Sequence, residues 1–236
     1  MNKHVLNQPS CANCDRENDL FCALNKSEKE HLSDTKRMNF YKKGQVIFYD
    51  NHFPYCLYCI HDGKVKVTKM GDQGKEQIVR LAGPGDLLGY RAVLSGEKYR
   101  GSAIAIEDSY ICALSKDKFF ELLENNPKLS INTIQLLTKD LRQSEQKLAS
   151  VVQKTVKERL AETLLMLKER FGVSSGGTIL DVHLTRREIG DIAGMTTETV
   201  IRTLSDFNKE KIVRLNGKKI ELLDIPRLAL MANLED

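Results

Sequence analysis

The 236-residue sequence has only 5 Pro, 15 Gly and 6 Cys, and it contains no long run of apolar residues. With 41% hydrophobic and 29% charged residues, this composition excludes a collagen-like or disordered chain and indicates one large or two small cores. A membrane-spanning helix needs about 18 or more apolar residues in succession, and no segment offers them. Residues 1–10 lack the apolar centre of a secretory signal. We therefore expect a cytoplasmic protein without a membrane partner.

Catalytic motifs are lacking as well. The 5 His are scattered, and there is no nucleophile elbow, phosphate-binding loop or zincin motif, so we expect that the protein is not an enzyme. The cysteines are too sparse for a disulfide framework, which is typical of small secreted domains, and are expected to be thiols or metal ligands. The formal net charge of +4 permits a polyanionic partner without requiring one.

Short β-rich runs alternate with turn signals between Arg37 and Leu114, such as Asp62-Gly63 and Ser95-Gly96. Strands at roughly ten-residue spacing predict an antiparallel β-roll, because each hairpin must bury one face against another sheet. The expected fold class is α+β, with a β-roll domain over residues 1–126, a long helix over 127–155 and a compact helical domain over 156–236. The predicted strands are 45–49, 56–61, 65–70, 76–81, 102–106 and 110–114.

After Pro127 the apolar period changes from two to about 3.5, which indicates a long helix with an apolar seam. Polar residues on its other faces favour a narrow stripe that packs on a partner helix, so we predict a two-fold homodimer. Packing of the seam on the β-roll is the alternative. The ladder consists of Ile134, Leu137, Leu141, Ser144, Leu148, Val151 and Thr155.

The most informative segment begins at Thr185. Thr185 and Glu188 form a capping-box pattern, which predicts a short helix, and Gly194 is expected to end that helix after two turns. Thr196 is expected to cap a second helix, so the pair predicts a helix-turn-helix. The buried stripe expected on the second helix is Val200, Leu204 and Phe207.

The second helix leaves an unusual face exposed. Arg202 can donate two hydrogen bonds to guanine, Glu198 can accept one from cytosine, and Ile201 can contact a thymine methyl group in the major groove. A surface ion pair without further function is the alternative. Asn216-Gly217 between two β-rich runs predicts a type I′ hairpin, which makes the module winged. The residues expected to contact double-stranded DNA are Thr185, Arg186, Thr196, Thr197, Glu198, Thr199, Ile201, Arg202, Lys218 and Lys219.

The roll, the long helix, the segment LTRREIGDIAGMTTETVIR from Leu184 to Arg202 and the wing segment 217–220 together resemble the CRP/FNR superfamily of bacterial transcription regulators. The resemblance implies a roll like the cyclic nucleotide-binding domain and a homodimer that binds a two-fold symmetric operator and contacts RNA polymerase. It therefore implies a sequence-specific transcription regulator that responds to a signal sensed by its N-terminal domain. A ligand-binding module that controls a protein partner without DNA is the remote alternative.

In the cyclic-nucleotide branch of this superfamily, a Gly-Glu pair holds the ribose and an Arg-Ser pair holds the phosphate. Here Tyr90 stands in the place of the glutamate, and Arg100 is followed by Gly101 before Ser102. Loss of the carboxylate removes the acceptor for the ribose hydroxyl, which argues against cyclic AMP. Another small ligand in the same cavity is the alternative signal. The residues expected to line the cavity are Gly89, Tyr90, Arg91, Arg100, Gly101 and Ser102.

The sequence resembles more closely the oxygen-sensing branch, in which N-terminal cysteines and one cysteine of the roll hold a [4Fe–4S] cluster. The corresponding candidate metal ligands are Cys11, Cys14, Cys22 and Cys112. The gap from Cys14 to Cys22 is wider than usual in that branch. Four thiolates would also suit zinc, and metal-free, redox-active thiols are the third hypothesis. Cys56 and Cys59 are expected to be core thiols, because three steps along a strand place them on opposite faces.

Overall fold

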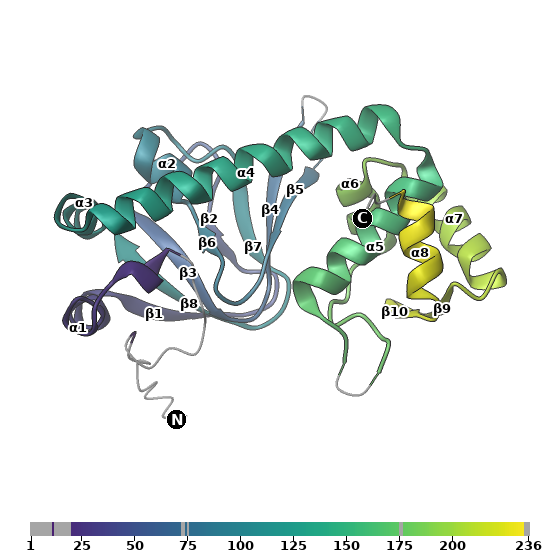
Figure 1. The fold of residues 1–236 in the computed structure, drawn as a ribbon, viewed down its shortest axis with the longest axis horizontal. Helices are drawn as coiled ribbons and strands as arrows, with labels where there is room; N and C mark the ends of the chain where they lie inside the picture. The colour runs from purple at the N-terminus through teal and green to yellow at the C-terminus, as the bar shows by residue number, and fades with distance from the viewer. Residues whose placement is uncertain (1–10, 12–19, 72–73, 75, 175–176, 234–236) are drawn as a thin grey trace. The chain divides into compact units, whose positions relative to one another are not determined.

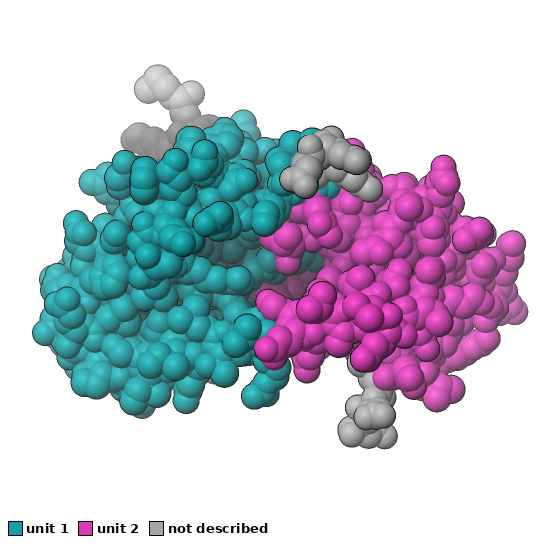
Figure 2. All heavy atoms as spheres, turned by 90° about the horizontal axis from the view of Figure 1, so that it is seen from above, with its two compact units in different colours: residues 1–76, 80–142 teal, residues 77–79, 143–236 magenta. Residues whose placement is uncertain are grey.

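The computed structural model describes residues 11, 20–71, 74, 76–174 and 177–233 (Figure 1), and they form the α+β architecture that the sequence predicts. The chain divides into two compact units (Figure 2). Unit 1 comprises residues 1–76 and 80–142, and unit 2 comprises residues 77–79 and 143–236. Among the described residues, no helix is both long and apolar enough to cross a membrane.

The N-terminal part of the chain folds into a β-roll with flanking helices. Its two four-stranded sheets have the strand orders β1-β8-β3-β6 and β2-β7-β4-β5. Each predicted strand is present within about two residues, whereas the strands β1 and β6 and the helices α1 to α3 were not predicted. The elements are η2 (Phe21–Ala23), α1 (Lys26–Thr35), β1 (Arg37–Tyr41), β2 (Val46–Phe48), β3 (Cys56–Asp62), β4 (Val65–Met70), β5 (Glu76–Ala82), β6 (Leu87–Leu88), α2 (Tyr90–Ser95), β7 (Ser102–Ala105), β8 (Ser109–Ser115) and α3 (Lys116–Asn125).

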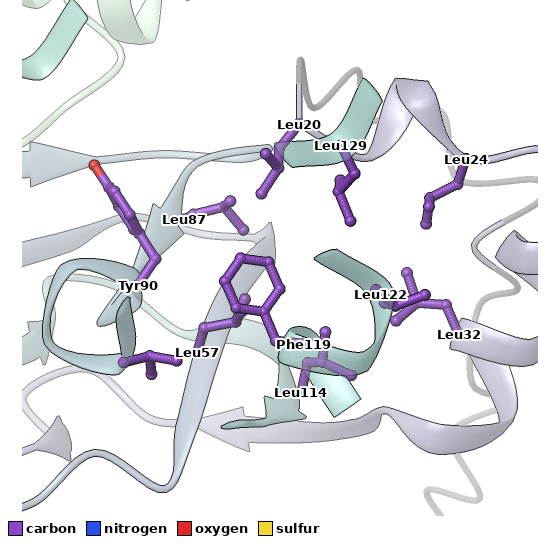
Figure 3. Close-up of a cluster of buried hydrophobic side chains, with 11 residues drawn as sticks. Leu20, Leu24, Leu32, Leu57, Leu87, Tyr90, Leu114, Phe119, Leu122 and Leu129 are labelled. Atoms are coloured by element: carbon purple, nitrogen blue, oxygen red, sulfur yellow. The ribbon is translucent and has the colours of Figure 1, made fainter. Parts of the chain in front are cut away.

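The β1-β8-β3-β6 sheet is apolar on both faces, because successive side chains of its strands contribute to two different clusters. Tyr58 and Ile60 of β3 belong to the cluster inside the roll, with Phe48 and Ile111. Leu57 belongs to a second cluster, in which the sheet packs against the surrounding helices (Figure 3). This second cluster consists of Leu20, Leu24, Leu32, Leu57, Leu87, Tyr90, Val93, Leu114, Phe119, Leu122 and Leu129.

Helix α4 (Pro127–Gln153) is the longest helix of the chain as described, with 27 residues. Its first turns are fixed to the second cluster by the buried Leu129 and by the partly buried Leu136 and Leu137. The prediction that Thr155 extends the apolar ladder is wrong. Thr155 lies beyond the end of α4 and caps the next helix, where its side chain accepts a hydrogen bond from the backbone N–H of Glu158.

Unit 2 contains the end of α4 and a helical module with a small hairpin. Its remaining elements are α5 (Val156–Phe171), α6 (Arg186–Ala193), α7 (Thr197–Lys209), β9 (Val213–Asn216), β10 (Lys219–Leu222) and α8 (Ile225–Ala232). Strands β9 and β10 are paired so that Asn216 lies opposite Lys219, which leaves Gly217 and Lys218 as the loop. A type I′ turn requires positive φ at both loop residues, but only Gly217 has it, at +58°. The predicted hairpin is therefore present, whereas the predicted turn type is wrong.

Candidate nucleic-acid interface and sensor residues

Helix α6 begins and ends where the sequence predicts. The side chain of Thr185 accepts from the backbone N–H of Glu188, and the carboxylate of Glu188 accepts from the backbone N–H of Thr185, at 2.9 Å. Gly194 ends the helix in the left-handed conformation, with φ of +66°. Inside the helix, a Cβ atom at Gly190 would lie 2.7 Å from the carbonyl oxygen of Met195. Glycine at this position therefore allows the turn between the two helices to approach α6 closely.

Helix α7 is capped by Thr196, whose side chain accepts a hydrogen bond from the backbone N–H of Thr199. The predicted buried stripe is confirmed, because Val200, Leu204 and Phe207 are fully buried. The opposite face presents Glu198, Ile201 and Arg202, all of them exposed, with Ile201 at 53%. The apolar face thus anchors the helix in the core. The opposite face exposes the carboxylate of Glu198, the apolar side chain of Ile201 and the guanidinium group of Arg202.

Arg186, which the sequence predicts as a DNA contact, also makes a hydrogen bond within the protein. Its Nη2 atom donates to the carbonyl oxygen of Gly217 at 3.0 Å, which fastens the start of α6 to the turn of the wing. Its Nη1 atom is buried and has no hydrogen-bond partner among the described residues. Burial lowers the pKa of Arg186. By contrast, Lys218 and Lys219 at the tip of the wing are exposed.

Two cationic side chains that the sequence did not single out hold the end of α6. Lys147 of α4 donates from Nζ to the carbonyl oxygen of Ile192. Arg159 of α5 donates from Nε to the carbonyl oxygen of Ala193 at 3.1 Å. The last carbonyl groups of a helix lack partners within the helix and carry partial negative charge, which these cations satisfy. The helix-turn-helix is therefore tied directly to the long helix.

The predicted seam of α4 is largely uncovered within one chain. Four of its five apolar positions are exposed, namely Ile134 (62%), Leu141 (60%), Leu148 (69%) and Val151 (43%). Leu137 differs, because it packs against the cluster beneath α4. A row of exposed apolar side chains on one helix is characteristic of a surface that another protein covers.

Among the residues predicted to line a ligand cavity, Tyr90 is buried and is held by charged side chains of other segments. Its ring is only 1% exposed and lies at the edge of the second cluster, with the hydroxyl group pointing away from the leucines (Figure 3). The hydroxyl donates to the carboxylate of Asp140 on α4 and accepts from Nη1 of Arg80 at 3.0 Å. Arg91 reaches the same carboxylate at 3.2 Å. Burial raises the pKa of Tyr90. Arg80 and Asp140 were not predicted, because contacts between distant segments leave no local pattern.

The other predicted cavity residues have separate roles. Arg100 is exposed and pairs with Glu97 at 3.4 Å. Gly101 is required by packing, because a Cβ atom there would lie 2.6 Å from the carbonyl oxygen of Thr68. The hydroxyl of Ser102 accepts from the backbone N–H of Asp50, and Gly89 caps α2 in the left-handed conformation. Gly89, Gly101 and Ser102 thus have roles in the fold of the roll, whereas Arg100 makes a surface ion pair.

The cysteines of the predicted metal site are only partly covered by the structure, because Cys14 lies outside the described residues. Cys11 packs against the second cluster, and Cys112 is buried on β8. Cys22 is exposed, and its sulfur accepts from the amide of Asn132 at 3.7 Å. Thiolates suit either a cluster or zinc. Within the part of the chain that is described, no three Cys, His, Asp or Glu side chains lie together so that they could hold one metal ion.

Two known domain families match the chain. The cyclic nucleotide-binding domain family matches residues 38–126, and the Crp-like helix-turn-helix domain family matches residues 158–231. The first match covers the roll from β1 to the end of α3. The second covers most of α5, the helix-turn-helix, the wing and most of α8.

Known proteins are similar to this chain over most of its length. The chain is 30% identical over 193 residues to the CRP-like cAMP-activated global transcriptional regulator of Mycobacterium tuberculosis, covering 81% of this chain and 86% of that protein. It is 31% identical over 214 residues to the fumarate and nitrate reduction regulatory protein of Vibrio cholerae, covering 89% and 85%. The solved structure of FixK2 from Bradyrhizobium japonicum matches with a TM-score of 0.77 at 26% identity, covering 85% of this chain and 99% of that one.

Proposed function

The chain belongs to the CRP/FNR family of DNA-binding transcription regulators, and we propose that it acts as a homodimer on a two-fold symmetric operator in response to a redox or oxygen signal. Its relatives are transcription regulators and not enzymes. We assign signal sensing to residues 1–126, dimerisation to residues 127–155 and DNA binding to residues 156–236. The protein would work in the cytoplasm, where its DNA target and RNA polymerase are found.

The exposed face of α7 is the observation that carries this proposal. Glu198 and Arg202 are four residues apart and exposed, on a helix whose other face is fully buried. Carboxylates are repelled by phosphates, so a glutamate on a helix that enters the major groove is best used to accept a hydrogen bond from cytosine. Arg202 would then donate to guanine, and Ile201 would contact a thymine methyl group.

Backbone contacts would come from the residues around this face. Helix N-termini attract phosphates, which suits Thr185, Thr196, Thr197 and Thr199 at the starts of α6 and α7. The exposed Lys218 and Lys219 would contact phosphates from the wing. The remaining candidate, Arg186, would act mainly by holding the wing through Gly217.

Dimerisation through α4 would set the geometry of the operator. Two copies related by a two-fold axis present two α7 helices, which fit successive major grooves about one helical turn apart. The exposed Ile134, Leu141, Leu148 and Val151 supply the apolar surface for this contact. Leu137 would contribute from the edge of the seam.

The FNR-like branch is favoured over the cyclic-AMP branch by the contacts of the predicted cavity residues. The relative in M. tuberculosis is cAMP-activated by name, yet here Tyr90 fills the position of the ribose acceptor and is engaged by Asp140 and Arg80. The charge of Arg100 is paired with Glu97. These contacts leave the cysteines as the better candidates for the sensor, with a [4Fe–4S] cluster, zinc or metal-free thiols as the three chemical forms.

Two measurements test the proposal. Selection of binding sites from random DNA should return a two-fold symmetric sequence, with a TGA-containing half-site by resemblance. A selection without such symmetry would contradict the DNA-binding part. Iron and zinc analysis of protein purified without oxygen tests the sensor part. Serine at Cys11, Cys14, Cys22 or Cys112 should remove any metal that is bound, whereas Cys56→Ser should leave the metal content unchanged.

A further inference from the structure

Two cysteines that are far apart in the sequence lie directly opposite each other in the β1-β8-β3-β6 sheet. The antiparallel pairing of β3 with β8 places Cys59 opposite Cys112. Opposite residues of an antiparallel pair have Cα atoms about 4.5 or 5.5 Å apart, depending on the hydrogen-bonding position. Both separations fall within the roughly 4.4 to 6.8 Å that a disulfide bond spans. The two residues are not bonded as a disulfide in this structure.

The side chains of this pair share one face of the sheet. Leu57 and Leu114 are also opposite each other, and both belong to the cluster that lies between the sheet and the helices. Cys59 is two residues from Leu57 and Cys112 is two residues from Leu114, so both thiols point to this same face. Cys59 packs against the cluster, as Cys11 does.

This placement changes the interpretation of Cys59. Cys56 and Cys59 do lie on opposite faces of β3, as the sequence predicts. The same alternation, however, brings Cys59 onto the face of Cys112, the only one of the four candidate metal ligands that lies within a strand as described. Cys56 is opposite Ser115 and is therefore the natural control.

We propose that Cys59 and Cys112 form a dithiol site that a peroxide oxidises to a disulfide, and that this oxidation changes the affinity for DNA. The proposal rests on the proposed redox-responsive function and gives it a specific pair of sulfur atoms. It differs from the metal hypothesis, because Cys59 is not among the four candidate metal ligands.

The chemistry requires one peroxide for each pair. The thiolate of Cys59 attacks one oxygen of hydrogen peroxide, the O–O bond breaks, and a sulfenic acid and water are formed. The thiolate of Cys112 then attacks the sulfur of Cys59, and the S–S bond forms as a second water leaves. The two thiols lose two electrons and two protons, and these reduce the peroxide to two waters. Cys59 is the first to react because it is only half-buried and so more accessible to peroxide than Cys112, which is 9% exposed.

The position of the pair connects it to the long helix. The cluster on this face also contains Leu129 of α4, with Leu136 and Leu137 packed against it. A bond between Cys59 and Cys112 would draw the two side chains together beneath this cluster, and packed cores respond to such shifts by repacking. Repacking would alter the base of α4, the helix that carries the dimer seam and the Lys147 contact to α6.

The experiment uses the full-length protein purified without oxygen, in the wild type and in the Cys59→Ser, Cys59→Ala and Cys56→Ser variants. Each is treated with hydrogen peroxide or left reduced. Peptide mapping by mass spectrometry identifies linked cysteines, and fluorescence anisotropy measures affinity for the selected operator. Wild type and Cys56→Ser should give a peptide that links Cys59 to Cys112 and an affinity change of about fivefold or more. Both Cys59 variants should give neither.

The outcomes separate this inference from the proposed function. If peroxide-treated wild type gives no linked Cys59–Cys112 peptide, or if both Cys59 variants keep the full affinity change, the dithiol site is wrong even though the protein is redox-responsive. If neither the reduced nor the oxidised wild type selects a two-fold symmetric operator from random DNA, the proposed function itself fails. The linked peptide is measured in the wild type, so this result does not depend on the folding of a variant.

Discussion

The hydroxyl of Tyr90, at the start of α2, donates a hydrogen bond to the carboxylate of Asp140 on α4. This bond joins the roll to the long helix at the position where the resemblance to the cyclic-nucleotide branch leads us to expect a ribose-binding glutamate. Arg80 and Arg91 pair with the same carboxylate, at 3.8 and 3.2 Å, so two cations and one phenol meet one anion. The side chains of Arg80 and Asp140 are only 19% and 11% exposed, so each largely buried charge is stabilised by the opposite charge of the other.

Removal of this carboxylate should destabilise the protein strongly. Asp140→Ala leaves the largely buried Arg80 without its anionic partner, which costs about 3 kcal/mol or more. Tyr90→Phe removes only the hydroxyl and should cost about 1 to 2 kcal/mol. Urea unfolding followed by circular dichroism measures both. The control is Glu97→Ala, which breaks the exposed pair with Arg100 and should cost less than about 1 kcal/mol. If Asp140→Ala and Glu97→Ala lower the free energy of unfolding equally, the buried contact contributes no more to stability than the exposed pair.

Base and phosphate contacts should respond differently to substitution. Arg202→Ala should weaken binding to the operator by about 1 to 3 kcal/mol and relax the preference at one guanine. Lys219→Ala should weaken binding to all sequences by a similar factor. It should also lower the slope of the logarithm of the binding constant against the logarithm of the salt concentration by about one. Anisotropy titrations at several salt concentrations, on the operator and on a variant with the guanine replaced, distinguish the two. An unchanged preference in the Arg202 variant would remove this residue from base recognition.

The seam of α4 should control association. Leu141 is 60% exposed in one chain, and its replacement by glutamate would place two like charges opposite each other across the two-fold axis. Leu141→Glu should therefore give monomers in light scattering and lose affinity for the operator. Lys139→Glu, an exposed substitution outside the predicted ladder, is the control and should remain dimeric. A dimer mass in the Leu141 variant would place the interface elsewhere.

Stability should fall at alkaline pH because of the partly buried Tyr58. Burial raises the pKa of Tyr58 from 10.0 to about 12, and the nearby Cys56 and Tyr41 add to this shift. An unfolded tyrosine releases its proton near its ordinary pKa, so the unfolded chain binds fewer protons than the folded one between about pH 10 and 12. The stability from Tyr58 is thus fully present below about pH 10 and is lost as the pH rises towards 12 and beyond.

Thermal unfolding should show a Tm that falls over this interval. The fall in Tm should be smaller in Tyr58→Phe than in the wild type. A substitution of Tyr55, which is 79% exposed, should leave the fall as it is in the wild type. A Tm that does not depend on pH in this range would contradict the effect.

The sequence alone determined the elements whose signals are local. Thr185, Gly194 and Thr196 predicted both ends of α6 and the start of α7, because capping hydrogen bonds and positive φ involve residues a few positions apart. The periodicity of Val200, Leu204 and Phe207 predicted the buried face of α7, which left Glu198 and Arg202 on the other face. The strands of the roll followed from β-rich runs between turn residues. These patterns give the candidate DNA-reading face almost completely.

Only the tertiary structure decided which distant residues meet. The register of β3 with β8 placed Cys59 opposite Cys112, and packing of α4 on the roll brought Asp140 to Tyr90 and Arg80. The contact of Arg186 with Gly217 likewise depends on how the wing folds back on α6. Local propensity fixes each segment by itself. Contacts between segments are selected by burial and charge pairing over the whole unit, and these forces leave no spacing that can be read along the chain.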